Sequence, residues 1–382
     1  MDDASPPKWH LAHITWFFET FVLKDQIKGY VPFDSRFEFL FNSYYNGIGQ
    51  PYARAKRGNL SRPTVQEVID YRTDIDAAVN KLLSGHISKE VRFRVELGLN
   101  HEQQHQELLL TDIKYNLGNN PLKPRYLDLA IHPEKITALV NWKEFQGGLI
   151  EVGASGNSGF VFDNETPRHK VFVEPFSLAT RAATNRDYLD FMQDGGYERH
   201  DLWLSDGWAH LATLPERWNA PLYWRRDGDS WLEYTLTGEK EIDLEAPVCH
   251  ISGYEADAFA RWSGARLPSE IEWEIAAASL NVSGNFLESG NYHPEAQAGP
   301  GMIGIYGDVW EWTSTGYGPY PGFRPFAGAL GEYNGKFMAN QLVLRGGSCA
   351  TPESHIRPTY RNFFYPADRW QFSGVRLAQD LV

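Results

Sequence analysis

The pattern of apolar residues changes near residue 142, and one type of secondary structure cannot account for both sides of the change. Before that point, apolar side chains recur at helical spacing over residues 9–23, 63–83 and 91–117. Beyond it, short segments such as 148–152 and 170–173 alternate with Gly, Asn and Asp turns, which is typical of strands. Two short helices are also expected there, over residues 185–192 and 269–278. The sequence therefore predicts an α+β protein whose first third is helical.

The helical part predicts an incomplete bundle. Four helices are the usual number for a closed bundle, so we expect a first helix to lie upstream of Met1 and to be missing from this chain. We predict a helical domain over residues 1–130 and a second domain over residues 131–382, with the linker between 123 and 141. Residues 281–303 show no periodicity, and long structured loops of this kind often build sites.

Composition restricts the partners and the compartment. The formal net charge is −13 and no Lys/Arg cluster forms a basic stripe, so a nucleic-acid partner is not expected. No apolar run approaches the roughly 20 residues that cross a bilayer, and the acidic start does not have the features of a signal peptide. Only Cys249 and Cys349 are present, too few for a secreted disulfide scaffold. We therefore expect a cytoplasmic protein with no membrane partner.

His101 and His105 form the sharpest local signal. They lie four residues apart in a predicted helix, so both imidazoles can reach one ion from the same face. The segment also resembles the zinc-protease pattern HExxH, in which the Glu acts as base, but no convincing third protease ligand follows it. Glu102 is one step along the helix, turned by about 100°, so we expect it to point away from the two histidines.

A third histidine can come from the first predicted helix, where His10 and His13 lie in the segment WHLAH. Three neutral nitrogen ligands with open positions suit zinc hydrolysis and iron(II)–oxygen chemistry about equally, so the ligands alone do not name the metal. We interpret His10 as an ordinary helical histidine in the core or on the surface, not as a ligand.

Nine segments in a fixed order together resemble one enzyme family. Those in the helical half are SPPKWHLAH (5–13), NSYYN (42–46), RGNLSRP (57–63) and HEQQHQELL (101–109). Those in the second half are FDNE (162–165), LPSEIEWE (267–274), GDVWEWT (307–313), LRGGS (344–348) and GVRLA (374–378). By these motifs the chain resembles the EgtB-type sulfoxide synthases of ergothioneine biosynthesis over nearly its whole length.

The resemblance implies a fold, a metal and a reaction. In that family a DinB-like helical bundle is joined to a domain resembling the formylglycine-generating enzyme, with a C-type-lectin-like fold. It implies that His13, His101 and His105 bind iron(II), with no carboxylate ligand. It also implies that the thiol of cysteine or γ-glutamylcysteine is coupled by O2 to the imidazole of hercynine (Nα-trimethylhistidine), which forms a C–S bond and a sulfoxide.

The resemblance also assigns roles within the helical half. One of Tyr44 and Tyr45 is expected to donate a proton, since a neutral phenol stays protonated near pH 7. Arg54 and Arg57 are expected to bind the carboxylate of the thiol substrate, which the guanidinium fork matches. Gln104 is expected to hydrogen-bond hercynine.

In the second half, Asn362 matches a family position that holds hercynine. Phe364 departs from the actinobacterial branch, which has an acidic residue there to bind the glutamyl amino group, and this favours free cysteine. Trp310 and Trp312 are interpreted as core packing. The site is expected to lie between the two domains.

Other functions remain open at this point. The nearest is a synthase of the ovothiol or selenoneine type, with the same iron site and another substrate. A formylglycine-generating enzyme would need a close cysteine pair for copper, but Cys349 has no partner nearby in sequence. A DinB-type thiol transferase would use a metal without oxygen, and a lectin-like binding module would bind without consuming oxygen.

Overall fold

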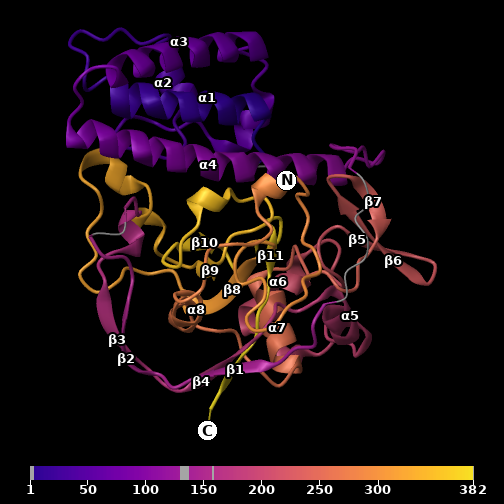
Figure 1. The fold of residues 1–382 in the computed structure, drawn as a ribbon. Coiled ribbons are helices and arrows are strands. Elements are labelled where there is room, and N and C mark those ends of the chain that lie inside the picture. The colour runs from indigo at the N-terminus through magenta and orange to yellow at the C-terminus, as the bar shows by residue number, and fades with distance from the viewer. Residues whose placement is uncertain (1–3, 130–136, 157–158, 382) are drawn as a thin grey trace. The chain divides into compact units, whose positions relative to one another are not determined.

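The computed structural model describes residues 4–129, 137–156 and 159–381. They form two compact units, and neither is a single stretch of chain (Figure 1). The helical unit comprises Met1–Asn116 together with Asn157–Asp163 and Arg324–Lys336. The mixed unit comprises Leu117–Gly156, Asn164–Phe323 and Phe337–Val382. The predicted mixture of helix and sheet is confirmed, while the domain boundary at residue 130 remains a prediction.

The helices of the first unit match the three predicted helical segments. Figure 1 shows α1, α3 and α4 running side by side in this unit. Their bounds, with those of the shorter helices, are α1 Pro7–Phe18, the π-helix η1 Glu19–Leu23, α2 Phe37–Phe41, the 3₁₀-helix η2 Arg54–Asn59, α3 Val65–Leu83 and α4 Lys89–Gly118.

The start of α1 is set by proline. Pro7 occupies the first helical position, where its fixed φ suits the helix and its missing N–H removes no intrahelical hydrogen bond. After Phe18 the helix widens into the π-turn η1, which begins at the buried Glu19. Glu19 accepts hydrogen bonds from the Tyr71 hydroxyl of α3 (2.5 Å) and from the Tyr30 hydroxyl (3.0 Å). The carboxylate thus ties the end of α1 to α3.

Helix α3 is amphipathic and capped. Thr64 and Glu67 form a capping box in which each side chain binds the other's backbone N–H. Its buried residues recur at helical spacing and lie on one face: Val68, Tyr71, Ile75 and Val79. This face packs on α1 and η1.

Helix α4 has 30 residues and contains no proline, so nothing interrupts it around His101. One turn earlier, Gly98 lies against α1. A Cβ atom at this position would lie 2.8 Å from the ring atoms of Phe18 and 3.2 Å from the ring of Phe17. Only glycine therefore permits this approach of α4 to α1 without movement of the two rings.

The described residues of the mixed unit form four small sheets (Figure 1). Their strand orders are β1-β4-β12, β10-β9-β8-β11, β2-β3 and β5-β6-β7, and only β8 and β11 pair in parallel. The strands are β1 Trp142–Phe145, β2 Gly148–Val152, β3 His169–Val173, β4 Phe176–Ala179, β5 Trp224–Asp227, β6 Ser230–Thr235, β7 Gly238–Glu241, β8 Trp310–Gly316, β9 Leu342–Arg345, β10 Asn362–Phe364, β11 Ser373–Gly374 and β12 Ala378–Asp380. The helices and 3₁₀-turns of the second half are η3 Asp163–Glu165, α5 Asn185–Gln193, η4 His200–Leu202, α6 Ser205–Thr213, α7 Gly253–Trp262, α8 Glu270–Ala277, η5 Leu287–Ser289, η6 Gly328–Glu332, η7 Gly335–Phe337 and η8 Glu353–His355.

The core of the mixed unit combines tryptophans with buried ion pairs. Trp310 and Trp312 of β8 are 1% and 0% exposed, which confirms their interpretation as core residues. Between them, Glu311 pairs with Arg376 at 2.8 Å, and both side chains are fully buried. Because a buried charge is tolerated only with a partner, loss of either side chain would destabilise the mixed unit.

The predicted strands 148–152 and 170–173 pair with each other as β2 and β3, and the predicted helices 185–192 and 269–278 correspond to α5 and α8. The sequence analysis did not predict α6, α7 or the β5–β7 sheet. Part of the predicted linker, residues 130–136, lies outside the described residues. Among the described residues no helix is long and apolar enough to span a membrane.

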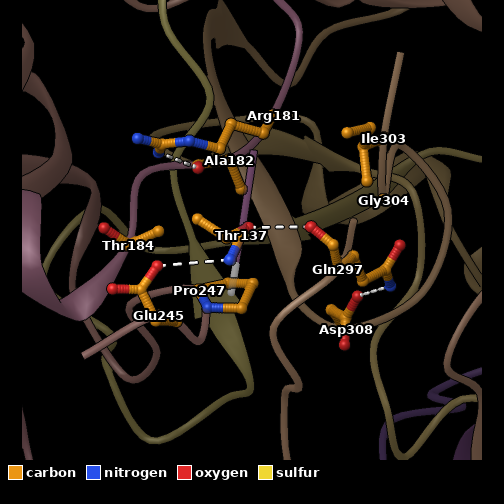
Figure 2. A pocket seen from close by; sticks show the side chains of 10 residues that line it. All are labelled: Thr137, Arg181, Ala182, Thr184, Glu245, Pro247, Gln297, Ile303, Gly304 and Asp308. Carbon is orange, nitrogen blue, oxygen red and sulfur yellow. Dashed lines mark hydrogen bonds between the residues drawn. The ribbon is translucent and has the colours of Figure 1, made fainter. Parts of the chain in front are cut away.

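Figure 2 shows a small polar pocket within the mixed unit. Its polar groups bind one another: the Thr137 hydroxyl donates to the Gln297 carbonyl (2.8 Å), and the Gln297 amide donates to Asp308. Burial raises the pKa of Asp308 to about 7. None of the predicted site residues lines this pocket.

Candidate metal centre

Three histidines converge in the helical unit. His13 comes from α1, and His101 and His105 come from α4. One ring nitrogen from each residue can be chosen so that all lie within 4.8 Å of one another. His13 and His101 are 0% and 2% exposed, and His105 is intermediate. The structure therefore brings together the three side chains predicted as ligands.

The site electrostatics keep these imidazoles neutral. Burial lowers the pKa of His101 to about 3. Burial, followed by repulsion from His101, lowers the pKa of His13 and of His105 well below its usual value. Neutral imidazole is the form that binds a metal ion, so near pH 7 no proton has to leave before ligation.

The hydrogen bonds orient the ring of His13. Its Nδ1 lies 2.6 Å from the carbonyl oxygen of Phe41, which can only accept, so Nδ1 carries the proton. This leaves Nε2 with a lone pair, 3.2 Å from Nε2 of His101. Two such atoms repel each other unless a proton or a cation lies between them. Among the described residues, the buried Nδ1 of His101 has no hydrogen-bond partner. The donor set fits a divalent transition metal such as iron(II) or zinc.

Glu102 lies on another face of α4. Both of its carboxylate oxygens accept from Arg72, at 3.1 and 3.2 Å. Within the described part of the chain, the group of potential ligand atoms contains no carboxylate. This placement argues against a zinc-protease centre, in which the Glu would act as base beside the two histidines.

Tyr44 and Tyr45 form a stacked pair with ring centroids 4.6 Å apart. The Tyr44 hydroxyl donates to that of Tyr45 at 3.5 Å. Burial raises the pKa of both phenols above the usual value, so both are protonated near pH 7. Tyr45 lies one ring from the cluster, since Trp16 has its centroid 5.6 Å from Tyr45 and 5.7 Å from His13.

Tyr333 is a site residue that the sequence analysis missed. It belongs to the segment Arg324–Lys336 of the helical unit, and its hydroxyl donates to Oε1 of Gln104. Its ring stacks on Phe162 and meets His101 edge-on, with centroid distances of 5.4 and 5.6 Å. No periodicity marks this loop, and Tyr333 lies 229 residues from Gln104 along the chain. No signal in the single sequence therefore points to this contact.

Hydrogen bonds hold the loop of Tyr333 within the helical unit. Glu332 accepts from the backbone N–H groups of Asn46 (3.0 Å) and Gly47 (2.7 Å), directly after Tyr44–Tyr45. Asp163 accepts from Asn334 at 2.8 Å. The loop is thus attached next to the tyrosine pair and next to α4.

The two arginines differ in environment. Arg54 is exposed, whereas Arg57 is 4% exposed. The Arg57 guanidinium lies 3.5 Å over the ring of Trp9, which stacks on His13 with centroids 4.7 Å apart. Arg57 also donates to the hydroxyls of Ser5 (3.2 Å) and Ser43 (3.0 Å). One ring, that of Trp9, thus lies between Arg57 and His13 of the cluster.

Asn362 and Phe364 lie on β10 of the mixed unit. The Asn362 side chain accepts from the backbone N–H of Phe363 at 3.0 Å, and the ring of Phe364 meets Trp370 with centroids 5.5 Å apart. Their part in the site, like the position of the site between two domains, remains a prediction.

The fold and the cluster define a class of protein in which a helical unit with a histidine centre is joined to a mixed unit of helices and strands. The family of the mixed unit is known. Residues 144–300 and 289–381 match the Sulfatase-modifying factor enzyme 1-like domain, FGE-sulfatase. Over 99% of its length the chain is 32% identical to the hercynine oxygenase of Mycolicibacterium smegmatis and 30% identical to that of Mycobacterium tuberculosis, covering 91% of each. It is 28% identical to the formylglycine-generating enzyme of Streptomyces coelicolor, over 55% of this chain and 78% of that one.

The chain belongs to the EgtB-type hercynine oxygenase family, and it is an oxidoreductase. The family predicted from the motifs is confirmed.

Proposed function

We propose that this chain is an oxygenase of the ergothioneine pathway that binds iron(II) through His13, His101 and His105. It would couple the thiol of cysteine to the imidazole of hercynine and oxidise the sulfur to a sulfoxide. The observation that carries the proposal is the convergence of three neutral, largely buried histidines in a chain of this family. When bound, iron(II) supplies the redox chemistry with dioxygen that a thiol and an imidazole do not undergo unaided at a useful rate.

The electron count fits one dioxygen per turnover. Forming the C–S bond removes two electrons and two protons, one from the thiol and one from the imidazole carbon. Oxidation of the sulfur removes two more electrons. One O2 accepts all four, and its atoms end in the sulfoxide and in one water.

The residues of the helical unit would bind and orient the substrates. Arg57, fixed by its stack on Trp9, and Arg54 in the same 3₁₀-helix would receive the carboxylate of cysteine. Tyr333 donates to the amide oxygen of Gln104, and the amide N–H groups of Gln104 would then bind hercynine. Tyr45 or Tyr44 would supply a proton from its phenol oxygen as dioxygen is reduced.

In the mixed unit, Asn362 is proposed to hold hercynine. The missing carboxylate at Phe364 favours cysteine over γ-glutamylcysteine. Both are inferences from the family pattern, and a kinetic test applies to each. For example, Asn362→Ala should raise KM for hercynine more than KM for cysteine.

The decisive experiment measures oxygen uptake by the iron(II)-loaded protein with hercynine plus cysteine, and with each alone. We expect uptake only with the pair, together with a product whose mass equals both substrates plus one oxygen atom minus two hydrogens. No oxygen uptake with the pair, the result expected of a DinB-type thiol transferase, would contradict the proposal. A formylglycine-generating activity is disfavoured because it would need a close cysteine pair for copper, and Cys349 has no second cysteine nearby in the sequence.

A further inference from the structure

His10 contacts the histidine cluster although it is not one of the three converging residues. It lies on α1 three residues before His13. Its Nδ1 is 2.9 Å from Nδ1 of His105, and its Nε2 is 3.0 Å from Oδ2 of Asp112, on α4. His10 and Asp112 are 4% and 3% exposed. The structure thus contains a buried chain of contacts from Asp112 through His10 to His105.

The acceptors determine which nitrogen carries each proton in the series of contacts from Asp112 to His105. An ionised carboxylate only accepts, so the proton between Asp112 and His10 sits on Nε2 of His10. With its proton on Nε2, His10 presents Nδ1 as the acceptor for Nδ1–H of His105. The remaining nitrogen of His105, Nε2, is left with its lone pair. In the other tautomer of His105, Nε2 would carry the proton and could not bind a metal ion.

The same logic operates at His13, where the Phe41 carbonyl holds the proton on Nδ1. Hydrogen bonding of the distal ring nitrogen to a carbonyl or carboxylate is a general way to fix the tautomer and orientation of a metal-binding imidazole. Among the described residues, no carbonyl takes this role for His105. Its partner is a second histidine, which is in turn held by a carboxylate.

Burying the carboxylate of Asp112 destabilises the fold, which argues against a purely structural role for this residue. It uses one oxygen, Oδ2, for both His10 and the backbone N–H of Ser5 (2.9 Å). Among the described residues its buried Oδ1 has no hydrogen-bond partner. A buried acceptor without a partner is destabilising, and apolar side chains would pack α1 on α4 at less cost. A carboxylate at this position is explained by its hydrogen bond to His10, which holds the proton on Nε2 of that ring.

We propose that Asp112 and His10 form a positioning relay that holds His105 in the tautomer and orientation required for metal binding. This inference rests on the proposed metal centre. It assigns no ligand and no proton-transfer step to either residue. Through Ser5, which also accepts from Arg57, the relay adjoins the proposed binding site for the substrate carboxylate.

The test compares variants that keep or remove the two hydrogen bonds of residue 10. His10→Gln retains an acceptor for His105 and a donor for Asp112, whereas His10→Ala retains neither. The measured quantities are the dissociation constant for iron(II), by anaerobic chelator competition, and the melting temperature of the metal-free protein. We expect His10→Ala to bind iron(II) about 10- to 100-fold more weakly. Asp112→Asn should change affinity in the same direction, and His10→Gln should stay within about threefold of the wild type.

His355→Ala is the matched control. His355 is a buried histidine of the mixed unit whose Nε2 bonds the Tyr360 hydroxyl at 3.0 Å, and it is not part of the proposed centre. This variant should lower the melting temperature of the metal-free protein and leave iron(II) affinity unchanged. If His10→Ala does not fold, the comparison of Asp112→Asn with His10→Gln gives the answer.

Two outcomes separate the relay from the proposed function. Wild-type affinity in both His10→Ala and Asp112→Asn would overturn the relay while leaving the metal centre in place. If Asp112→Asn is the only one of the two that folds, its wild-type affinity alone overturns the relay. Equal iron(II) affinity in the wild type and in His13→Ala would instead show that the three histidines do not bind the metal, and the proposed function would fail first.

Discussion

The side chains around the cluster are held in defined protonation states by burial and by their neighbours. His101, with its pKa lowered to about 3, is neutral at any physiological pH, and the phenols of Tyr44 and Tyr45 are protonated. The centre therefore offers uncharged nitrogen ligands beside uncharged proton donors. The three imidazoles and the two phenols thus add no charge of their own to that of a divalent cation and an anionic thiolate.

The tyrosine pair gives the first prediction. The Tyr44 hydroxyl donates a hydrogen bond to the Tyr45 hydroxyl, so the Tyr45 O–H can donate to another acceptor. We expect Tyr45→Phe to lower kcat by about 10²- to 10⁴-fold, the usual range for loss of a general acid, and Tyr44→Phe to have a smaller effect. Both variants keep the ring, so iron(II) affinity should not change.

Steady-state oxygen uptake and product analysis by mass spectrometry would test this. Because both pKa values are raised, ionisation of the phenols should produce no fall in kcat between pH 7 and 9. Wild-type kcat in both variants would exclude the pair as the proton source.

Phe364 gives the second prediction, which concerns the thiol. The glutamyl group brings an additional ammonium, and burying it without an acceptor costs several kcal/mol. We expect kcat/KM for cysteine to exceed that for γ-glutamylcysteine. Phe364→Asp should shift the ratio at least tenfold toward the dipeptide, which corresponds to about 1.4 kcal/mol.

Phe364→Asn is the control, because it has nearly the shape of Asp but no charge. The ratio of kcat/KM values for the two thiols should change much less in this variant. A wild type that prefers γ-glutamylcysteine would mean that another residue binds the glutamyl ammonium.

At the level of elements, the site depends on the contact between α1 and α4. Helix α1 provides His13 and α4 provides the other two histidines, so the distance between the helices sets the distance between the ligands. Gly98 lies one turn before His101 and permits the contact with Phe17 and Phe18.

The third prediction tests this contact. In Gly98→Ala the Phe18 ring must move, which lowers the free energy of unfolding by about 1–3 kcal/mol. The better helix propensity of Ala raises it by about 1 kcal/mol. We expect a net loss of stability and a weaker binding of iron(II), since His13 moves away from His101. Gly49→Ala serves as control because a Cβ there meets no atom within 4 Å.

Denaturant titration and chelator competition measure the two effects. Unchanged iron(II) affinity in Gly98→Ala would show that the helix contact does not set the ligand spacing.

The sequence predicted these elements to different degrees. The periodicity of 3.6 residues located α1, α3 and α4, and the spacing of His101 and His105 placed two of the proposed ligands on one face of α4. Helix α7 was not predicted, although Ser252 and Glu255 form a capping box at its start. The relay through His10 was also missed. A lone helical histidine looks the same in sequence whether it faces water, the core or a ligand.

For the molecule as a whole, contacts between distant segments are what a single sequence could not provide. The helical unit includes two segments from beyond residue 142, and with them Phe162 and Tyr333. No local sequence pattern predicts that these segments pack in the helical unit, because they are loops whose conformation is set by tertiary contacts. The motifs identified the family, and the structure placed Tyr333 beside His101.

The last prediction concerns the stability of the metal-free protein as a function of pH. In the folded state the pKa values of His101 and His355 are lowered to about 3, against about 6.5 in the unfolded chain. Between these values only the unfolded chain takes up the protons, so stability is present above pH 6.5 and is lost as pH falls. Each histidine contributes up to about 1.4 kcal/mol per pH unit. Asp308, with its pKa raised to about 7, acts in the opposite direction over the same window.

Since His13 and His105 act with His101, we expect a net loss of stability from pH 6.5 to 5, measured by urea unfolding after chelator treatment. In His355→Gln this dependence should be smaller by about one histidine's contribution, and an identical slope in wild type and variant would show that His355 does not stay neutral in the folded protein.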